Sequence, residues 1–252
     1  MSTRRRLDVE MVRRGLAASR TEAQGLIEAG SVRVAGAPAQ KAARLVDTGD
    51  AIVLAGPPRR FVSRGGEKLD AALDEFAIDV RGSRILDAGA STGGFTDCVL
   101  QRGAAEVIAV DVGYGQIHES LRADERVVVI ERTNIRALEP ETIGGRVDLV
   151  VGDLSFISLT KVVDPLLSVC RPSAPLVLLV KPQFEAGRSE VSKGRGIITD
   201  PEVWQRTLTE VTDAFELAGA VVRDSMTSPI QGADGNTEFL VHFTAPDAEN
   251  ER

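Results

Sequence analysis

The amino-acid sequence predicts an α/β protein in which a doubly wound, mostly parallel sheet follows a small α+β unit. Beyond residue 83, short apolar segments alternate with amphipathic stretches, as expected for strands that helices cover on both faces. A glycine-rich turn follows the first of these segments, where a sheet of this kind binds ligands. With 43% apolar and 27% charged residues, the 252-residue chain can bury a core and is too apolar for disorder.

The front of the chain predicts two helices followed by a small curled sheet. Apolar residues between Leu7 and Ala17 recur at helical spacing, and Ser19 provides an N-cap for a second helix over Arg20 to Ala29. Gly30 is placed to end that helix in a left-handed conformation. The alternating stretches and the turn of the small sheet follow at 32–34, 36–38 and 51–54.

Composition divides the chain after this unit. The run Gly56-Pro57-Pro58-Arg59-Arg60 is typical of a linker. We therefore expect a front unit over 1–55, a linker over 56–66, a body over 67–246 and a tail over 247–252.

The net charge of −7 conceals an asymmetry. Residues 1–68 hold 13 Lys and Arg against 7 Asp and Glu, whereas residues 69–252 hold 17 against 30. The basic front indicates a polyanionic partner, although a solubilising charge cluster would give the same composition. Cys98 and Cys170 lie far apart and there are only two histidines, so neither a disulfide framework nor a metal site is expected.

The body contains seven predicted strands. Those of the parallel sheet are predicted at 84–88, 107–111, 127–130, 147–151 and 176–180, and a terminal antiparallel pair at 221–227 and 238–243. In such a sheet, ligands bind outside the carboxyl ends of the strands.

The turn after the first strand favours a nucleoside over a pyrophosphate. Residues 87–96, Asp-Ala-Gly-Ala-Ser-Thr-Gly-Gly-Phe-Thr, contain Gly-x-x-x-Gly-Gly and lack the Gly-x-Gly-x-x-Gly of dinucleotide-binding turns. Asp111 closes the second strand, where a carboxylate can accept the hydrogen bonds of a ribose diol. Asn134 and Asp153 follow the next two strands, where they can bind an adenine edge and an amine.

Long strings of residues also resemble known families. Leu7-Asp8, the stretch 15–20, Val32-Arg33-Val34 and Gly49-Asp50 resemble the alpha-L RNA-binding domain. The turn at 87–96 resembles FtsJ-type S-adenosylmethionine-dependent methyltransferases. With the strings at 61–69, 154–159 and 180–185, residues 4–243 resemble the TlyA family of rRNA (cytidine-2′-O)-methyltransferases, whose older name is haemolysin A. Phe61 departs from relatives that often carry tryptophan there.

The resemblance implies a Rossmann-like methyltransferase body, an alpha-L front unit, and cytidine in the rRNA of small or large ribosomal subunits as substrate. The family's catalytic tetrad corresponds to Lys68, Asp153, Lys181 and Glu238. The residues implied to bind S-adenosyl-L-methionine are Gly89, Ala90, Ser91, Thr92, Gly93, Gly94, Phe95, Asp111, Val112, Asn134 and Asp153. Those implied to bind RNA are Arg6, Arg20 and Lys41, with Arg4 and Arg5 as a flexible extension, and Arg64, Arg132, Arg188 and Lys193 around the cleft.

The charges of the tetrad suit methyl transfer to a hydroxyl. The protein has to hold the hydroxyl oxygen in line with an activated methyl group and accept its proton. An ordinary lysine is protonated at neutral pH, burial or a second ammonium lowers a lysine pKa, and a carboxylate raises it. We expect Lys181 to orient or deprotonate the hydroxyl, Asp153 to tune it, and Lys68 and Glu238 to position their partners.

Four other functions remain as alternatives. A NAD-dependent oxidoreductase lacks its glycine pattern here, and a pseudouridine synthase would need a catalytic Asp, for which the only Arg-Leu-Asp lies in the front unit, at Arg6-Leu7-Asp8. A pore-forming haemolysin and a non-catalytic RNA-binding protein are the others. The longest apolar run, 175–180, is far below the ~20 residues that span a bilayer. No secretory leader is apparent, so a cytoplasmic location without a membrane partner is expected.

The segment Glu185–Gly196 has no apolar period and is predicted as a loop. It is either a lid that becomes ordered on RNA or an ordinary mobile surface loop.

Overall fold

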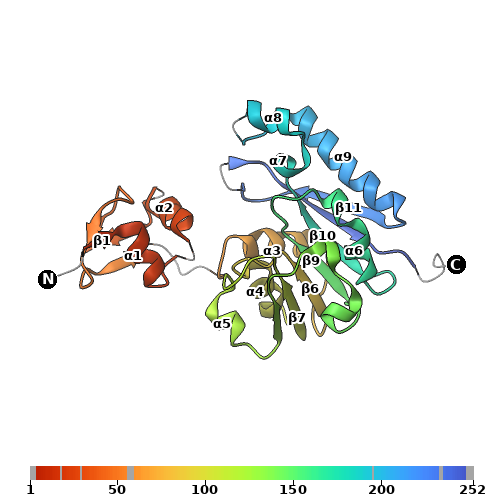
Figure 1. Cartoon of the computed structure of the whole chain (residues 1–252), viewed down its shortest axis with the longest axis horizontal. Helices are drawn as coiled ribbons and strands as arrows, with labels where there is room; N and C mark the ends of the chain where they lie inside the picture. Colours follow the sequence, from red (N-terminus) through yellow and green to blue (C-terminus); the bar gives the residue numbers. More distant parts are fainter. Residues whose placement is uncertain are drawn as a thin grey trace. The chain divides into compact units, whose positions relative to one another are not determined.

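A computed structural model describes residues 4–17, 19–28, 30–55, 60–194, 196–232 and 235–247. The chain divides into two compact units, Met1–Arg60 and Phe61–Arg252 (Figure 1). Residues 56–59 of the predicted linker lie outside the described residues, as do Ala29 and residues 248–252 of the predicted tail.

The first unit contains the two predicted helices and the small sheet. Its elements are β1 (Arg5–Arg6), α1 (Leu7–Arg13), α2 (Arg20–Glu28), β2 (Val32–Val34), β3 (Ala37–Pro38), β4 (Leu45–Val46) and β5 (Ile52–Leu54). Leu7 and Met11, one turn apart on α1, pack with Ala23 and Ile27, one turn apart on α2, in a separate buried core. β2, between β3 and β5, closes that core.

The ends of the two helices follow from their glycines. α1 stops short of Ala17 because Gly15 adopts a left-handed conformation, and the N–H of Leu16 then donates to the carbonyl of Met11 at 2.9 Å. Gly30, with a φ of 70°, ends α2 in the left-handed conformation that the sequence predicts.

The prediction that Arg4 and Arg5 form a flexible extension is wrong. Arg5 and Arg6 form β1, which pairs antiparallel with Val46 and Leu45 of β4. Arg4 forms an ion pair with Asp47 at 3.4 Å. Backbone pairing with a partner forty residues away, which no local pattern reveals, therefore holds this basic segment.

The second unit is built on a seven-stranded sheet with the order β11-β12-β10-β9-β6-β7-β8. Its strands are β6 (Arg84–Ala88), β7 (Glu106–Val110), β8 (Val127–Ile130), β9 (Leu149–Gly152), β10 (Pro175–Val180), β11 (Val221–Thr227) and β12 (Phe239–Thr244). The strands from β10 to β8 are parallel, and β12 runs antiparallel to both β10 and β11. This confirms the predicted Rossmann-like sheet with its terminal antiparallel pair.

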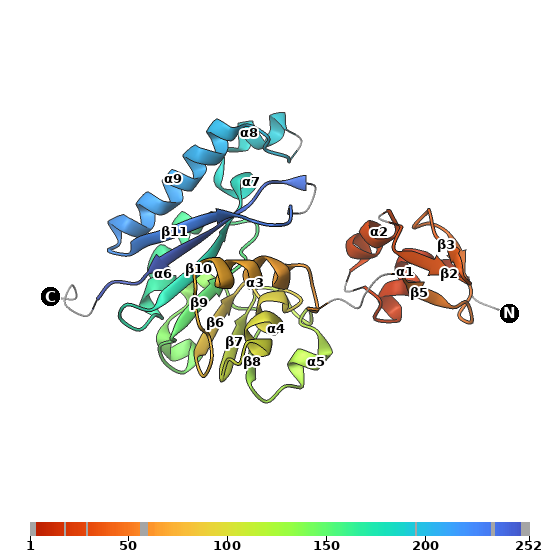
Figure 2. The same cartoon turned by 180° about the vertical axis from the view of Figure 1, so that it is seen from behind.

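Helices cover both faces of the sheet (Figure 2). The helices of this unit are α3 (Gly65–Glu75), α4 (Gly94–Gln101), α5 (Glu119–Arg122), α6 (Val163–Ser168), α7 (Pro182–Glu185), α8 (Arg188–Lys193) and α9 (Pro201–Leu217). Side chains of α3 and α4 share one buried cluster with Ile85, and those of α6 and α9 share another with Leu86, the next residue of β6. Alternate residues of one central strand therefore face two cores.

The amino-terminal ends of α3 and α4 meet without side chains between them. A Cβ atom added to Gly94 would collide with the hydroxyl of Ser63 and lie 3.0 Å from the backbone nitrogen of Gly66. Phe61, 4% exposed, packs against Gly66. The segment that leads into α3 is therefore part of the second unit.

The prediction of a loop over Glu185–Gly196 is wrong. The end of α7 and the short helix α8 occupy most of it, and the segment leads towards α9 (Figure 1). Pro182 lies in the first turn of α7, and the N–H of Gly187, ahead of α8, donates to the carboxylate of Glu190 at 3.3 Å. Helices this short carry too few apolar positions to show a period.

Asp87 is a buried acid inside β6. One carboxylate oxygen accepts hydrogen bonds from the N–H and the hydroxyl of Thr96, at 2.9 and 2.6 Å, whereas Oδ1 has no partner in the described part of the chain. Burial raises the pKa of Asp87 to about 7 against the opposing bonds from Thr96, and the carboxylates of Asp153 and Asp111 raise it further. The folded protein therefore holds a proton here that the unfolded chain releases near pH 4.

This proton predicts a pH-dependent effect of Asp87→Asn. Since the folded-state pKa is raised, the group's contribution to stability is present below about pH 4 and is lost as pH rises through about 7. The variant should therefore gain stability relative to the wild type between pH 5 and 8, by roughly 4 kcal/mol at most. Urea unfolding followed by the fluorescence of the single tryptophan, Trp204 on α9, measures this unit. Asp79→Asn is the control, because Arg81 holds the pKa of that exposed acid at about 2. If the free energy of unfolding changed with pH in the same way in both variants, the raised pKa of Asp87 would be contradicted.

Candidate functional site

The carboxyl edge of the sheet brings the tetrad residues together. β12 pairs antiparallel with β10, and Val180 lies opposite Phe239. The next residues outward, Lys181 and Glu238, therefore leave the sheet at the same edge, although they are separated by 57 positions. Asp153 follows β9, the other neighbour of β10, and its N–H donates to the carbonyl of Ala88 in β6 at 3.1 Å.

The four charged side chains form two ion pairs. Lys68, on α3, contacts Glu238 at 2.5 Å, and both side chains are less than a tenth exposed. Lys181 forms an ion pair with Asp153 and donates to the hydroxyl of Ser155 at 2.8 Å. Each buried ammonium therefore has its own carboxylate, which offsets the cost of removing both charges from water.

Gln183 connects the two pairs. It lies two residues after Lys181, and its Nε2 donates to Oε1 of Glu238 at 3.3 Å. Glu238 is thus held by a lysine from α3 and an amide from α7. Neither Ser155 nor Gln183 was assigned a role from the sequence, although both lie in the strings that resemble the family.

A cavity of about 510 Å³ opens beside the Lys181 pair. The predicted cofactor residues among its lining are Gly89, Ser91, Asp111, Val112, Asn134 and Asp153. Gly89 has a φ of 83°, and a Cβ atom there would lie 2.9 Å from Leu154 and 3.0 Å from the carbonyl oxygen of Asp153. The backbone can therefore approach a ligand closely at this turn only without a side chain.

The polar groups of the cavity are held in place by backbone bonds. Asp111 accepts from the N–H of Ser91 at 2.8 Å and from that of Gly113 at 2.6 Å, one on each carboxylate oxygen. Each oxygen keeps a second lone pair for a ligand hydroxyl. Asn134 accepts from the N–H of Arg136 at 3.0 Å, which leaves its amide N–H groups available for a base edge.

The remaining predicted cofactor residues support the turn from outside the cavity lining. Phe95 is buried in the core with α3, Gly93 and Gly94 allow α4 to start close to its neighbours, and Ala90 is 7% exposed. The carbonyl of Thr92 accepts from the N–H of His118 at 3.1 Å.

Phe156 is an aromatic residue that sequence reasoning missed. It lines the cavity, is 91% exposed and has a φ of 64°, a conformation that costs free energy for a residue with a side chain. Its ring packs against Phe184 with the centroids 5.1 Å apart, and Lys181 Nζ lies 5.6 Å from the Phe184 ring. An exposed aromatic face therefore stands next to the Lys181 pair.

Glu185 fixes the loop that carries Phe156. Its carboxylate accepts from the N–H of Leu159 at 2.9 Å, and burial raises its pKa. The string Lys181–Glu185 thus supplies four side chains that each contact another part of the site or the loop beside it.

The predicted RNA-binding residues fall into two groups that the structure describes separately. In the first unit, Arg6 and Arg20 both bind Asp8, and Lys41 is exposed beside Arg44. In the second unit, Arg64 is exposed ahead of α3, and the Arg132 guanidinium lies 4.3 Å from the centroid of the Tyr114 ring. The side chains of Arg188 and Lys193 lie outside what the structure describes.

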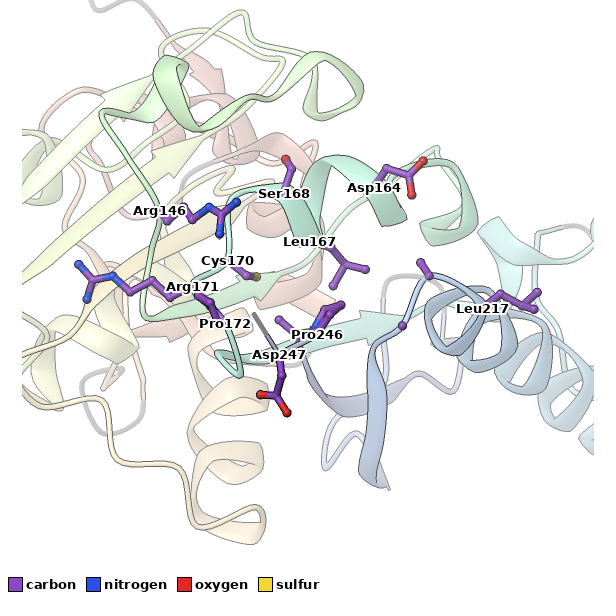
Figure 3. A pocket seen from close by; sticks show the side chains of 13 residues that line it. Arg146, Asp164, Leu167, Ser168, Cys170, Arg171, Pro172, Leu217, Pro246 and Asp247 are labelled. Atoms are coloured by element: carbon purple, nitrogen blue, oxygen red, sulfur yellow. The ribbon is translucent and has the colours of Figure 1, made fainter. Parts of the chain in front are cut away.

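A second cavity, of about 500 Å³, lies at the opposite edge of the sheet (Figure 3). Arg146, Cys170 and Arg171, which line it, precede the amino ends of β9 and β10. Burial raises the pKa of the Cys170 thiol to about 12, so this cysteine is not a nucleophile at neutral pH. The glycine turn and the two ion pairs are at the other edge.

Comparison with known proteins matches both units. The FtsJ-like methyltransferase family matches residues 61–245, and the S4 domain family matches residues 5–52. The 16S/23S rRNA (cytidine-2′-O)-methyltransferase TlyA of Mycobacterium tuberculosis is 52% identical over 96% of this chain and 90% of its own length. Hemolysin A of Brachyspira hyodysenteriae is 42% identical over 94% of this chain and 99% of its own.

A solved structure agrees over both units. A protein of Streptococcus thermophilus described as a hemolysin is 39% identical, covers 98% of this chain and 90% of its own, and superposes with a TM-score of 0.79. These matches confirm the predicted two-part fold and the resemblance to a methyltransferase. The chain belongs to the TlyA family of FtsJ-like methyltransferases.

Proposed function

We propose that this protein methylates the ribose 2′-hydroxyl of a cytidine in ribosomal RNA, with S-adenosyl-L-methionine as the methyl donor. The observation that carries the proposal is the Lys181–Asp153 pair at the carboxyl edge of the sheet, where Asp153 also lines a cavity of about 510 Å³. The 52% identical relative is named for this reaction on 16S and 23S rRNA. Residues 67–246 would be the transferase and residues 1–55 the RNA-docking unit.

The residues that would hold S-adenosyl-L-methionine fit its chemistry. Asp111 offers oxygens for the ribose diol, and Asn134 lines the same cavity with amide N–H groups that bind no other described residue. Asp153 offers an oxygen to the ammonium group of the cofactor. Gly89 gives the close backbone approach that the ligand requires. When bound, the cofactor supplies a methyl group already activated on a sulfonium.

The ion pair of Lys181 gives this lysine a fixed direction. Lys181 donates to the hydroxyl of Ser155 and forms an ion pair with Asp153, so two groups on the loop after β9 hold its ammonium. We assign Lys181 the task of orienting the ribose hydroxyl and relaying its proton: as Nζ takes the hydroxyl proton, it passes one of its own protons to the carboxylate of Asp153. Lys68 and Gln183 both contact Glu238 and so fix the start of β12 next to β10, the strand that ends at Lys181.

Phe156 gives the target nucleotide a surface to stack on. A ribose hydroxyl within reach of Lys181 belongs to a nucleotide drawn out of its helix, and unstacked bases commonly bind aromatic faces. The exposed ring of Phe156, fixed by Phe184 and the Glu185 bond to its loop, supplies such a face.

The hemolysin name of some relatives points to the second candidate function. In the described part of the chain, none of the helices is both long enough and apolar enough to cross a bilayer. The favoured reaction takes place on ribosomal subunits, and we therefore place the protein in the cytoplasm.

The proposal predicts methyl transfer to unmodified ribosomal subunits. Purified protein with S-adenosylmethionine carrying a labelled methyl group should label 2′-O of a cytidine in small subunits, large subunits or both. Mapping the labelled nucleotide identifies the site. Labelling of a base atom, or leakage of liposomes without labelling of rRNA, would refute the proposal.

Lys181→Ala should lower the rate of methyl transfer by about 10²–10⁴-fold while cofactor binding stays near the wild-type value. Removing the ammonium leaves the ribose oxygen without its donor, whereas the cavity lining is retained. The matched control is Lys161→Ala, an exposed lysine at the end of a short 3₁₀ helix. Single-turnover rates with bound subunits measure the effect. A wild-type rate for Lys181→Ala would exclude its role.

Lys68→Met and Glu238→Gln should each destabilise the second unit by about 3 kcal/mol, because each leaves a buried charge or dipole without its partner. The double variant should lose less free energy of unfolding than the sum of the two single losses, and all three variants should be less active than the wild type. Trp204 fluorescence in urea gives the stabilities. Additive losses would show that the pair is not coupled.

Phe156→Ala should raise KM for ribosomal subunits by about 10-fold or more, since stacking on a base contributes about 1–3 kcal/mol. Phe156→Tyr should restore it, and Leu217→Ala, an equally exposed residue at the end of α9, should have no effect. Equal KM values for Phe156→Ala and the wild type would contradict a stacking role.

A further inference from the structure

Two arginines of the first unit share one buried carboxylate. Asp8, on α1, is completely buried, whereas the side chains of Arg6 and Arg20 are 43% and 57% exposed. Arg6 binds it through two donors, Nε to Oδ1 at 3.0 Å and Nη2 to Oδ2 at 2.9 Å. Arg20 Nη2 and Gln24 Nε2 also donate to Oδ2, each at 3.1 Å.

The shared oxygen holds two positive groups side by side. Since both Nη2 atoms bond to Oδ2, they lie within about 6 Å of each other. Like charges at this distance repel, and the carboxylate between them removes that cost before any ligand arrives. The N–H of Val9 donates to Oδ1 at 2.9 Å, so the backbone of α1 fixes the carboxylate itself.

Backbone bonds attach a further basic segment to the same place. The N–H of Asp8 donates to the carbonyl of Ala42 at 3.2 Å, and that of Leu7 donates to the carbonyl of Arg44 at 2.7 Å. Lys41, exposed, lies one residue before Ala42. The surface therefore presents two guanidinium groups with a third cation on a neighbouring segment.

We infer that Asp8 is a positioning residue that holds Arg6 and Arg20 as a single clamp for phosphate groups of the RNA backbone. Guanidinium groups bind phosphate oxygens with paired, directional hydrogen bonds, and the gain is largest when their orientation is fixed beforehand. The inference rests on the proposed rRNA function and extends it to an acidic residue that never touches the RNA.

Charge and position predict opposite effects of Asp8→Asn. The variant makes the protein more positive by one charge, so attraction to a polyanion alone would tighten RNA binding. Loss of the clamp should instead weaken binding of the full-length protein to unmodified ribosomal subunits by about tenfold, since ionic hydrogen bonds would no longer orient both arginines. Filter binding over a series of salt concentrations, without cofactor, measures the change.

Glu10→Gln is the matched control. Glu10 lies on the same helix, is equally buried and holds Arg13 and Arg14 at 2.6 and 2.8 Å, so its substitution removes the same charge and the same kind of network. We expect this variant to bind subunits at least as tightly as the wild type. Equal weakening by both variants, or unchanged or tighter binding by Asp8→Asn, would overturn the inference.

A second measurement covers the case in which Asp8→Asn fails to fold, as checked by circular dichroism. Arg6→Ala and Arg20→Ala change exposed side chains, and a clamp predicts that the double variant loses little more affinity than either single variant. Additive losses would overturn the inference. Methyl transfer by the wild type is assayed on the same subunits: a wild type that neither binds nor methylates them refutes the proposed function, whereas binding that is insensitive to Asp8 refutes the clamp alone.

Discussion

The antiparallel pairing of β12 with β10 is the constraint on which the site depends. Parallel strands alone would bring the residues after β6, β9 and β10 to one edge. β12 adds a residue that precedes a strand, Glu238, at that same edge, because its direction is reversed. Glu238 in turn pairs with buried Lys68, and so links α3 to the sheet edge. A methyltransferase with a wholly parallel sheet would have to find that anchor elsewhere.

The hydrogen bonds of the site show how a mostly apolar sheet carries so much charge. Each buried ammonium is paired, and the carboxylates of Asp111 and Glu185 are bonded to backbone N–H groups of neighbouring loops. The charged side chains therefore have two roles: they supply the chemical groups of the site, and they connect neighbouring loops through hydrogen bonds. Asp87 differs, because its Oδ1 has neither a hydrogen bond nor an ion pair among the described residues and burial raises its pKa to about 7.

Much of the fold could be predicted because its signals are local. The strands at 84–88, 127–130 and 221–227 have the predicted bounds, and Gly30 ends its helix as its chemistry requires. The two wrong predictions have different causes: β1 depends on pairing with the distant β4, and α8 is too short to show a visible period.

Some residues of the candidate site could likewise be predicted from local sequence signals, and others could not. The types and strand-end positions of Lys181, Asp153 and Asp111 could be read along the chain, whereas the membership of Lys68 and Glu238 in the tetrad came from the family resemblance alone. That these two residues, 170 positions apart, pair with each other is seen only in the structure. Nothing in a hydrophobic pattern distinguishes Phe156, exposed and left-handed, from a core phenylalanine. The two oxygens of Asp111 were predicted to face a ligand, and both are also used by the backbone.

The glycine contact between α3 and α4 couples the position of a tetrad lysine to that of the glycine-rich turn. α3 carries Lys68, α4 begins where the cofactor turn ends, and the helices touch through Gly94 and Gly66 with no side chain as a spacer. A methyl group added at Gly94 would force the two helices apart and so displace both Lys68 and the turn. We therefore expect substitutions there to impair catalysis, even though neither glycine lines the cavity.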